Sequence, residues 1–477
     1  MSANELCFLS ATELQPLIAS RAISPVELTR TVLDRIAALQ PVLNCFITVC
    51  DEAAMREARA SEQRVMRGEP SGLLNGIPYT VKDLVNTRGV RTTFGSILLE
   101  NNTPDEDAVV VARLREQGAI LVGKTTTPEF GAKGLTDAPL FGRTRNAWDA
   151  TRTCGGSSGG AAVAVACGLA PLAVASDGGG STRIPAACNG TVGLKQSNGT
   201  IPHSQALDAF GNYTYVTPMT RTVADTALML QAVAGPHASD PWSIGLAVPD
   251  YLSAARAQGD LRGLRVLFGA SPAARPVARE VRSAFEAALT RLASLGAELE
   301  EMPDEGFDIE PIWRVINHST WRARLAPMVA RDGARMSPSL VRQVESAAAF
   351  SGEEYQQAMF ARAALFRRVQ TLFERADLIA TPTLLRTAVP IDQDLFDPIE
   401  IDGIAVPDMR PGWYPWTMPF NLTGHPALSL NCGFASDGLP IGLQLATAPW
   451  KPDILHVAHA YERATEWRKK TPALEME

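Results

Sequence analysis

Two serine-bearing glycine turns combine residue types and a spacing that could do chemistry. The first spans residues 154–160 (CGGSSGG) and the second residues 176–185 (SDGGGSTRIP), with Ser157 and Ser181 separated by 181 − 157 = 24 positions. Glycine lets backbone N–H groups approach a reacting group closely and point into one concavity. The turns therefore indicate a serine nucleophile next to an oxyanion hole.

Lys82 is the candidate base for such a serine, because no histidine is convincingly placed. It follows an apolar segment, residues 76–81 (GIPYTV), which is typical of a buried strand. Burial disfavours the ammonium ion, so the pKa of a buried lysine falls and its neutral amine can accept a proton. A lysine in this place is more often a surface or ion-paired residue, however, and Asp83 is then its structural partner.

Residues 118–125 (GAILVGKT) match the spelling of a P-loop. A P-loop needs a flexible glycine-rich loop between a strand and a helix. Here the supposed loop is Ala-Ile-Leu-Val, which has the pattern of a strand, and Pro128 follows. The sequence therefore does not support a nucleotide site.

Residues 155–159 (GGSSG) match the nucleophile elbow of α/β-hydrolases, which would make Ser157 the nucleophile and His425 its histidine. The elbow follows a buried strand. Residues 143–153 are instead polar and rich in turn formers. The elbow remains open as the rival mechanism.

Strand and helix patterns alternate along the chain and predict an α/β protein with an N-terminal helical layer in residues 1–70 and a catalytic core in residues 76–200. Helices are expected at 12–20, 25–40, 51–67, 107–117, 158–167, 223–233, 279–295 and 353–375, and strands at 76–81, 119–122, 172–175, 264–268, 377–380, 427–431 and 441–445. Residues 387–419 are rich in proline and aromatics and have no clear periodicity, so they predict either a substrate-side loop or lid or an ordered surface loop.

Composition excludes several function classes. The chain has 477 residues, of which 46% are hydrophobic and 20% charged, and its formal net charge of -7 gives no footprint for nucleic acid or an anionic membrane. Seven cysteines without a Cys-x-x-Cys pair and a start without a secretory signal favour free thiols in the cytoplasm. His456 and His459 fit an amphipathic C-terminal helix better than a metal site.

Several long motifs in the same order resemble the amidase signature family over almost the whole chain. They are residues 76–83 (GIPYTVKD), 155–160 (GGSSGG), 177–185 (DGGGSTRIP) and 419–427 (PFNLTGHPA), with shorter matches at 128–130, 141–149 and 438–444. The resemblance implies a single domain over residues 1–477, built as an α/β/α sandwich around a large, mixed, twisted β-sheet.

The resemblance also implies a catalytic triad and decides against the elbow. In the family pattern Ser181 is the nucleophile, Ser157 is a bridging serine preceded by a cis peptide bond, and Lys82 is the base. Ser181 would form an acyl-enzyme while Ser157 relays its proton to neutral Lys82. Neither a cofactor nor a metal is required.

Further residues of the two turns are expected to support this triad. The N–H groups of Gly178, Gly179, Gly180 and Ser181 are expected to bind the oxyanion, each donor contributing about 3 to 4 kcal/mol. Three more residues have either a supporting role or only local capping and pairing roles: Ser158 and Asp177 would hold the turns by hydrogen bonds, and Arg183 would neutralise a buried carboxylate.

The expected partners are a small-molecule amide and water, with a homo-oligomer possible. Aromatics near residues 131–137, 312–321 and 413–417 predict a pocket for an aryl or alkyl amide. Esters or carbamates (urethanes) remain open because they pass through the same oxyanion. The glutamine amidotransferase A subunit, another family member, usually carries a Tyr-Asp-Gly segment that residues 310–375 lack. A stand-alone amidase is therefore preferred.

Overall fold

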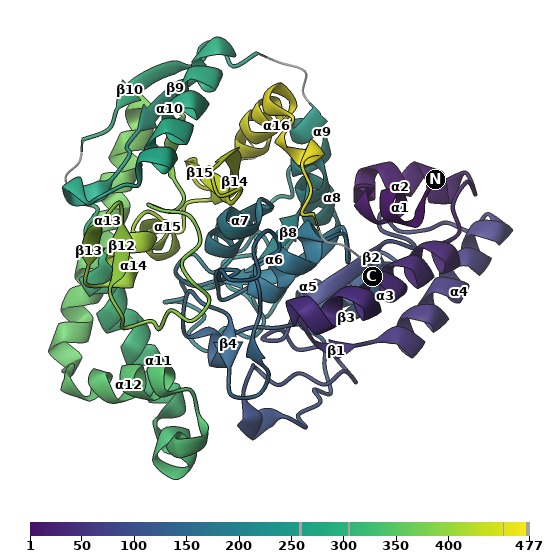
Figure 1. The fold of residues 1–477 in the computed structure, drawn as a ribbon, viewed down its shortest axis with the longest axis horizontal. Coiled ribbons are helices and arrows are strands. Elements are labelled where there is room, and N and C mark those ends of the chain that lie inside the picture. The colour runs from purple at the N-terminus through teal and green to yellow at the C-terminus, as the bar shows by residue number, and fades with distance from the viewer. Residues whose placement is uncertain (257–259, 304–305, 452, 474–477) are drawn as a thin grey trace.

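One mixed β-sheet organises the chain (Figure 1). The computed structural model describes residues 1–256, 260–303, 306–451 and 453–473. In this part the sheet has eleven strands in the order β1-β3-β2-β6-β8-β7-β14-β15-β11-β9-β10. The strands are β1 (Phe46–Val49), β2 (Pro78–Lys82), β3 (Ile120–Thr125), β6 (Leu172–Asp177), β7 (Val192–Lys195), β8 (Tyr215–Thr220), β9 (Arg265–Phe268), β10 (Glu298–Glu301), β11 (Leu378–Pro382), β14 (Ala427–Phe434) and β15 (Pro440–Ala446). The expected α/β class with a large mixed sheet is confirmed.

Parallel pairing is confined to two places in the sheet. Strand β2 runs parallel to β3 and β6, and β9 runs parallel to β10 and β11. The other pairings are antiparallel. Because β2 and β6 are parallel neighbours, the residues at their carboxyl ends come out at the same edge of the sheet.

Helices cover both faces of the sheet. They are α1 (Ala3–Phe8), α2 (Ala11–Ala19), α3 (Pro25–Leu43), α4 (Asp51–Arg67), α5 (Val109–Glu116), α6 (Gly159–Ala166), α7 (Arg183–Asn189), α8 (Val223–Val233), α9 (Tyr251–Arg256), α10 (Arg279–Ser294), α11 (Glu310–Asp332), α12 (Pro338–Ser346), α13 (Gly352–Arg375), α14 (Met409–Trp413), α15 (Met418–Thr423) and α16 (Asp453–Thr465). Among these helices, none combines the length and the apolar character that a membrane span requires.

Side chains of the strands alternate between two hydrophobic cores, as the period of a strand demands. In β11, Leu378 and Ala380 belong to a core shared with α8, α10 and α16, whereas Ile379 faces a second core shared with α7, α13 and α15. Near the centre, small alanines of α6 pack against Ala173 and Ala175 of β6. The strands are therefore covered on both sides by helices.

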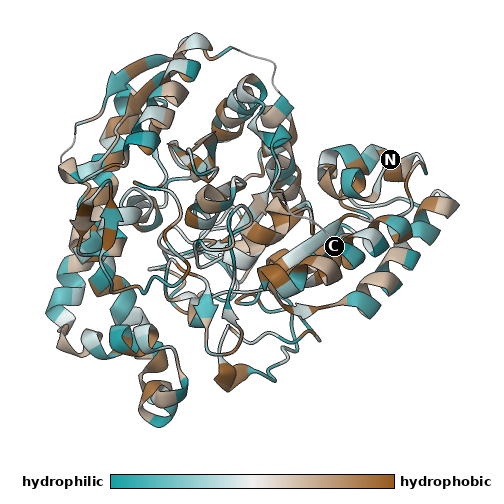
Figure 2. Cartoon of the chain, in the orientation of Figure 1, coloured by the Kyte–Doolittle hydropathy of each residue, from teal (hydrophilic) through white to brown (hydrophobic). Residues whose placement is uncertain are grey.

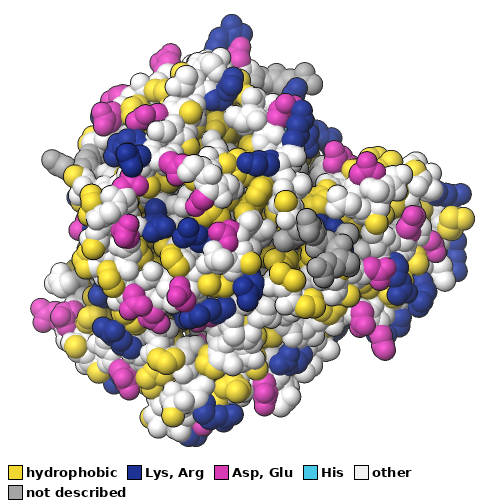
Figure 3. Space-filling model, in the orientation of Figure 1, with side chains coloured by type: hydrophobic (Ala, Val, Ile, Leu, Met, Phe, Trp, Pro, Cys, Tyr) yellow, Lys and Arg dark blue, Asp and Glu magenta, His cyan; other side chains and the backbone are white. Residues whose placement is uncertain are grey.

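The surface mixes hydrophobic with hydrophilic residues and basic with acidic ones. Figure 2 shows hydrophobic and hydrophilic residues interspersed along the outer helices. On the face in Figure 3, Lys and Arg side chains alternate with Asp and Glu, without an extended region of one sign. This face offers no basic stripe of the kind that nucleic-acid binding requires.

Most predicted elements are present, with ends shifted by a few residues, and residues 387–419, where the sequence predicts no helix or strand, contain several short elements. This segment contains the hairpin of β12 (Ile399–Ile401) and β13 (Ile404–Val406), the helix α14 and the start of α15. Trp413 and Trp416 are 0% and 1% exposed. The aromatics have no periodicity because they fill the second core from several short elements.

Helix α11 was not predicted although it forms one wall of the site described below. Its sequence contains Pro327, and a proline inside a helical pattern usually indicates a helix end. The helix also begins with Pro311 in its first turn, where proline is tolerated because the missing N–H has no partner in the helix.

Candidate active site

Lys82 is the last residue of β2 and lies at the edge where β2 and β6 end together. The register pairs Val81 with Val174, which brings Lys82 next to the end of β6. Its Nζ atom is 2.8 Å from Ser157 Oγ, 2.8 Å from Ser158 Oγ and 2.9 Å from Ser176 Oγ. The amine therefore sits in a cage of three hydroxyl groups.

The cage contains no carboxylate to compensate a charge on Lys82. The side chain is fully buried, and burial lowers the pKa of Lys82 well below its usual value, although the more distant Asp177 acts in the opposite direction. Burial therefore favours the neutral amine over the ammonium ion. Such an amine has one lone pair with which to accept a proton.

Ser157 and Ser158 approach Lys82 from the turn that precedes α6. The peptide bond between Gly156 and Ser157 is cis, as the family resemblance implied. The Ser158 hydroxyl donates to the carbonyl of Ser176 at 3.0 Å and accepts the N–H of Ser176 at 3.2 Å. Because its hydrogen is used there, Ser158 can only accept from Lys82. The hydroxyls of Ser157 and Ser176 each keep a hydrogen that can point at the amine.

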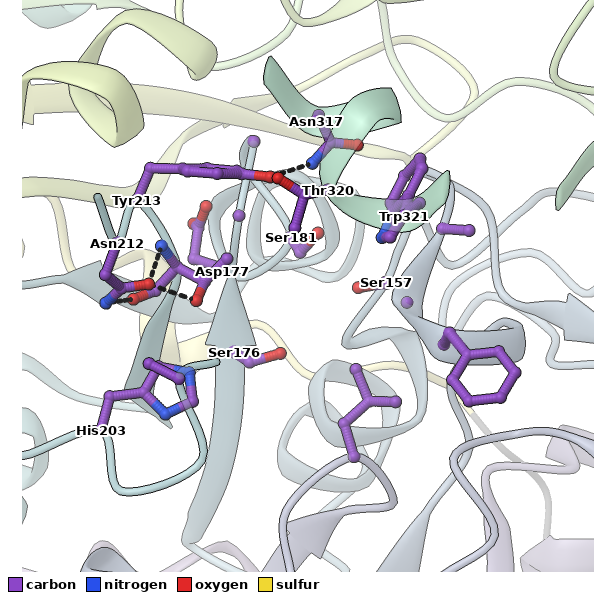
Figure 4. Close-up of a pocket in the computed structure, with 18 of the residues that line it drawn as sticks. Ser157, Ser176, Asp177, Ser181, His203, Asn212, Tyr213, Asn317, Thr320 and Trp321 are labelled. Carbon is purple, nitrogen blue, oxygen red and sulfur yellow. Dashed lines mark hydrogen bonds between the residues drawn. The ribbon is translucent and has the colours of Figure 1, made fainter. Parts of the chain in front are cut away.

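Ser181 lies at the same cavity as Ser157 and Ser176, just before α7 (Figure 4). Its side chain is half-buried, and its hydroxyl makes no hydrogen bond within the described residues. The backbone ties the two turns together, because the N–H of Ser158 donates to the carbonyl of Ser181 at 3.0 Å. The structure thus brings Lys82 and Ser157 into contact and places Ser181 opposite them without a direct bond.

The expectation that all three glycines of the second turn offer free N–H groups needs correction at Gly180. Its N–H donates to Asp177 Oδ1 at 2.6 Å and is therefore used within the turn. In the described part of the chain, the N–H groups of Gly178, Gly179 and Ser181 have no acceptor. These three remain available to a ligand.

Asp177 and Arg183 form a buried ion pair under the second turn. Arg183 Nε lies 3.0 Å from Asp177 Oδ2, and both side chains are 0% exposed. Burial raises the pKa of Asp177, but the charge of Arg183 and hydrogen bonds from Arg183, Asn421 and Gly180 outweigh it and hold the pKa at about 2. Arg183 also donates to Gln444 and Asn421. Asn421 lies in the motif at residues 419–427, but nothing in the sequence pattern indicates its contact with Asp177.

Asp83 is the partner of Lys124 and not of Lys82, which corrects one of the two sequence interpretations. The ion pair measures 3.7 Å between Lys124 Nζ and Asp83 Oδ1, and both side chains are 0% exposed. Lys124 also donates to Val85 and to the hydroxyls of Thr87 and Thr92. Burial lowers the pKa of Lys124 to about 8, against the charge of Asp83. The lysine of the P-loop spelling is thus a strand residue buried in the fold.

The Lys124→Met substitution is expected to destabilise the fold by about 3 to 5 kcal/mol, because it leaves the Asp83 carboxylate buried without its cation. Chemical denaturation measures the change. The Lys124→Met and Asp83→Asn double variant should recover part of the loss, since a neutral amide no longer needs the cation. Purely additive effects of the two substitutions would contradict a coupled pair.

The histidine of the rival mechanism lies elsewhere. His425 is buried, and its ring nitrogens contact Thr423 Oγ1 at 2.9 Å and Gln370 Oε1 at 2.7 Å. It is not among the residues that line the cavity. His456 and His459 both lie on α16, as the amphipathic pattern predicted. All seven cysteines are unpaired.

A cavity of about 230 Å³ opens in front of Ser157 and Ser181. One wall is a single face of α11, with Trp313, Asn317, Thr320, Trp321 and Arg324 at helical spacing. The remaining walls include residues 130–134, Tyr414, the segments around Leu84 and Phe94, and a loop that includes 203, 205–208 and 211–214. The sequence gave no pocket signal for the last three of these segments. Figure 4 shows Asn317 hydrogen-bonded to Tyr213 above the serines.

Comparison with known proteins agrees with this geometry. The family model named Amidase matches residues 27–455 of the chain. The chain belongs to the amidase signature family. An acylamidase from Rhodococcus erythropolis is 36% identical over 483 residues, which cover 99% of each chain. The chain is accordingly an amidohydrolase.

Other members differ in what they act on. The A subunit of glutamyl-tRNA(Gln) amidotransferase from Roseiflexus sp. is 35% identical over 495 residues, covering 98% of this chain and 99% of that one. The crystal structure of a bacterial aryl acylamidase of the amidase signature family has a TM-score of 0.90 at 30% identity, with 97% of each chain covered. Membership therefore leaves the substrate of this amidase to be argued from its pocket.

Proposed function

We propose that this amidase hydrolyses the amide bond of a small aryl or alkyl amide through an acyl-enzyme on Ser181. The observation that carries the proposal is the buried Lys82 amine, 2.8 Å from Ser157 Oγ, at a cavity that Ser181 also lines. A neutral buried lysine can supply the base that a serine nucleophile needs. Water and the amide are the only reactants.

The proton moves along the line from Ser181 through Ser157 to Lys82. As Ser181 Oγ attacks the carbonyl carbon, it gives its proton to Ser157, which passes its own to the lone pair of Lys82. Protonated Lys82 then returns a proton through Ser157 to the nitrogen of the departing amine, and the C–N bond breaks. Water repeats the attack on the acyl ester and releases the acid.

Charge on the carbonyl oxygen is met by backbone N–H groups of the second turn. The free donors are those of Gly178, Gly179 and Ser181, and one such donor is commonly worth about 3 to 4 kcal/mol in the transition state. The ion pair of Asp177 with Arg183 supports the turn, since Asp177 also accepts the N–H of Gly180 at 2.6 Å. The supporting role of Ser158 is to orient Lys82 toward Ser157.

An apolar, aromatic substrate suits the walls of the cavity. Phe94, Phe130, Trp313, Trp321 and Tyr414 line it, and aromatic walls bind rings and alkyl chains by area and stacking. The aryl acylamidase and acylamidase relatives support an anilide. Esters and carbamates remain second candidates because the same serine attacks their carbonyls.

A role as an amidotransferase A subunit is the alternative that the similarity to the Roseiflexus protein favours. It requires a partner protein and a glutamine substrate. The aromatic cavity argues against it, because the side chain of glutamine is small and polar. Location in the cytoplasm and self-association stay predictions from the sequence.

Purified chain without partners is expected to hydrolyse 4-nitroacetanilide, which releases 4-nitroaniline and is followed by absorbance. A panel with aliphatic amides, 4-nitrophenyl acetate, a phenyl carbamate and glutamine ranks the candidates by kcat/KM. Glutamine hydrolysis that exceeds anilide hydrolysis would support the amidotransferase. No turnover of any amide in the panel would contradict the proposal.

A further inference from the structure

Each carbonyl group of the second glycine turn is held by a hydrogen bond. The acceptors and donors are Asp177 O with Asn421 Nδ2 (3.0 Å), Gly178 O with Trp313 Nε1 (3.0 Å), Gly179 O with Thr417 Oγ1 (2.7 Å), and Gly180 O with Ile184 N (2.7 Å). In a trans peptide unit, the C=O and the following N–H point in opposite directions. A donor that holds a carbonyl therefore also sets the direction of the next N–H group.

The peptide unit between Gly178 and Gly179 is held from the wall of the substrate cavity. Trp313 of α11 donates its indole N–H to the carbonyl of Gly178, so the N–H of Gly179 points away from the indole. That N–H has no acceptor in the described part of the chain. A Cβ atom at Gly179 would lie 2.9 Å from Cζ2 of Trp313, so the ring also lies directly against the backbone.

The Trp313 ring itself is fixed on its other sides. It is 6% exposed, the guanidinium carbon of Arg410 lies 5.3 Å from its centroid, and Trp321 packs edge-on at 6.3 Å. Arg410 is held in turn by a hydrogen bond to Gln343. A ring with these contacts cannot follow a moving loop, so it holds the Gly178 carbonyl at a set position.

We propose that Trp313 is a positioning residue for the oxyanion hole. Its indole N–H holds the Gly178 carbonyl so that the Gly179 N–H stays directed at the oxyanion that forms when Ser181 attacks. The role rests on the proposed serine mechanism and adds to it a residue outside the signature motifs. Trp313 also lines the cavity, so one side chain both forms part of the substrate pocket and orients a backbone donor.

Preorganisation explains why this hydrogen bond affects rate more than substrate binding. A glycine-rich turn rotates its peptide units at little steric cost. Catalysis by an oxyanion hole depends on donors that already point at the developing charge and need no reorganisation during the reaction. Loss of the indole N–H therefore weakens binding of the transition state and leaves binding of the planar amide nearly unchanged.

The Trp313→Phe variant tests the proposal, with Trp321→Phe as its matched control. Both tryptophans lie on the same face of α11 and line the same cavity. Trp313→Phe is expected to lower kcat for 4-nitroacetanilide by about tenfold or more, with KM within about twofold of the wild type. The indole N–H of Trp321 does not contact the Gly178 carbonyl, so kcat should fall less in Trp321→Phe than in Trp313→Phe, while KM changes with the shape of the cavity wall.

A second measurement separates orientation of the donor from packing. The ketone 2,2,2-trifluoroacetophenone adds to a serine to form a tetrahedral oxyanion, whereas acetophenone stays planar in the site. Inhibition by the trifluoro ketone should weaken in Trp313→Phe by the same factor as kcat, and inhibition by acetophenone should not. Replacing Trp313 by 3-benzothienylalanine, which keeps the ring shape without the N–H, should reproduce both results if Trp313→Phe fails to fold.

The outcomes distinguish the proposal from the mechanism on which it rests. A wild-type kcat in a folded Trp313 variant would overturn the role of Trp313, and so would an equal weakening of inhibition by the trifluoro ketone and by acetophenone. Either result would leave the serine mechanism intact. Full amide hydrolysis by Ser181→Ala would overturn the mechanism itself, and with it this inference.

Discussion

Ser181→Ala is expected to lower kcat for 4-nitroacetanilide by about 10⁴-fold or more, as removal of a serine nucleophile does elsewhere. The substitution should leave the fold intact, because the Ser181 hydroxyl makes no hydrogen bond within the described residues and the side chain is half-buried. Steady-state kinetics measures the loss. Mass spectrometry after mixing with 4-nitrophenyl acetate should show an acetyl adduct on the wild type and none on the variant.

Thr320→Val provides the matched control for Ser181→Ala. It removes another hydroxyl from the same cavity, one that donates to the carbonyl of Ile316 in its own helix. Its kcat should stay within about tenfold of the wild type, as for a change away from the reacting atoms. An acetyl adduct on Ser157 in place of Ser181 would restore the nucleophile elbow and contradict the triad.

Lys82→Met is expected to lower kcat/KM for the anilide by about 10²- to 10⁴-fold, the usual range for loss of a general base. The loss should be smaller for 4-nitrophenyl acetate, because 4-nitrophenolate leaves without a proton whereas an amine does not. Comparing kcat/KM for the two substrates in one variant measures this difference. Equal losses would contradict a role for Lys82 in protonating the leaving group.

Lys195→Met is the matched control, since Lys195 is equally buried and burial also lowers its pKa well below the usual value. Its Nζ lies over the ring of Tyr215 and outside the cavity, so its loss should spare the anilide reaction. The pH profile adds a second check. A base with a lowered pKa is neutral above that pKa, so kcat/KM of the wild type should fall as pH drops through it. Persistence of this acid limb in Lys82→Met would assign it to another group.

The sequence predicted the elements that carry local signals. Strand β2 is recognisable from its apolar residues before Lys82, and the periodic pattern predicts α8 at 223–233, where the structure has it with Thr222 as its cap. The serine turns were recognisable from glycine, which marks places where the backbone must approach closely. These signals are local, and so they survive without knowledge of the fold.

Contacts between distant segments could not be predicted. The sequence suggests Lys82 as the partner of Asp83 because the two are neighbours, yet the register of β2 against β3 sets Val81 opposite Lys124, and the Lys124 side chain forms the ion pair with Asp83. Gly180 was expected to be a free donor because it is a glycine in the turn, yet the carboxylate of Asp177 takes its N–H. The sequence pattern does not predict the strands β7 and β8 or the helix α11, because tertiary packing, more than periodicity, determines them.

Helix α11 affects both the substrate selectivity and the turnover of the enzyme. One of its faces shapes the cavity through Asn317, Thr320 and Trp321, and Trp313 on that face holds a peptide unit next to the nucleophile. A library that varies this helix to admit new amides would therefore change turnover and selectivity together. Phe94 and Phe130 line the cavity from other segments of the chain and do not contact the Gly178 carbonyl, so varying them offers a route to new substrates that leaves the Trp313 hydrogen bond in place.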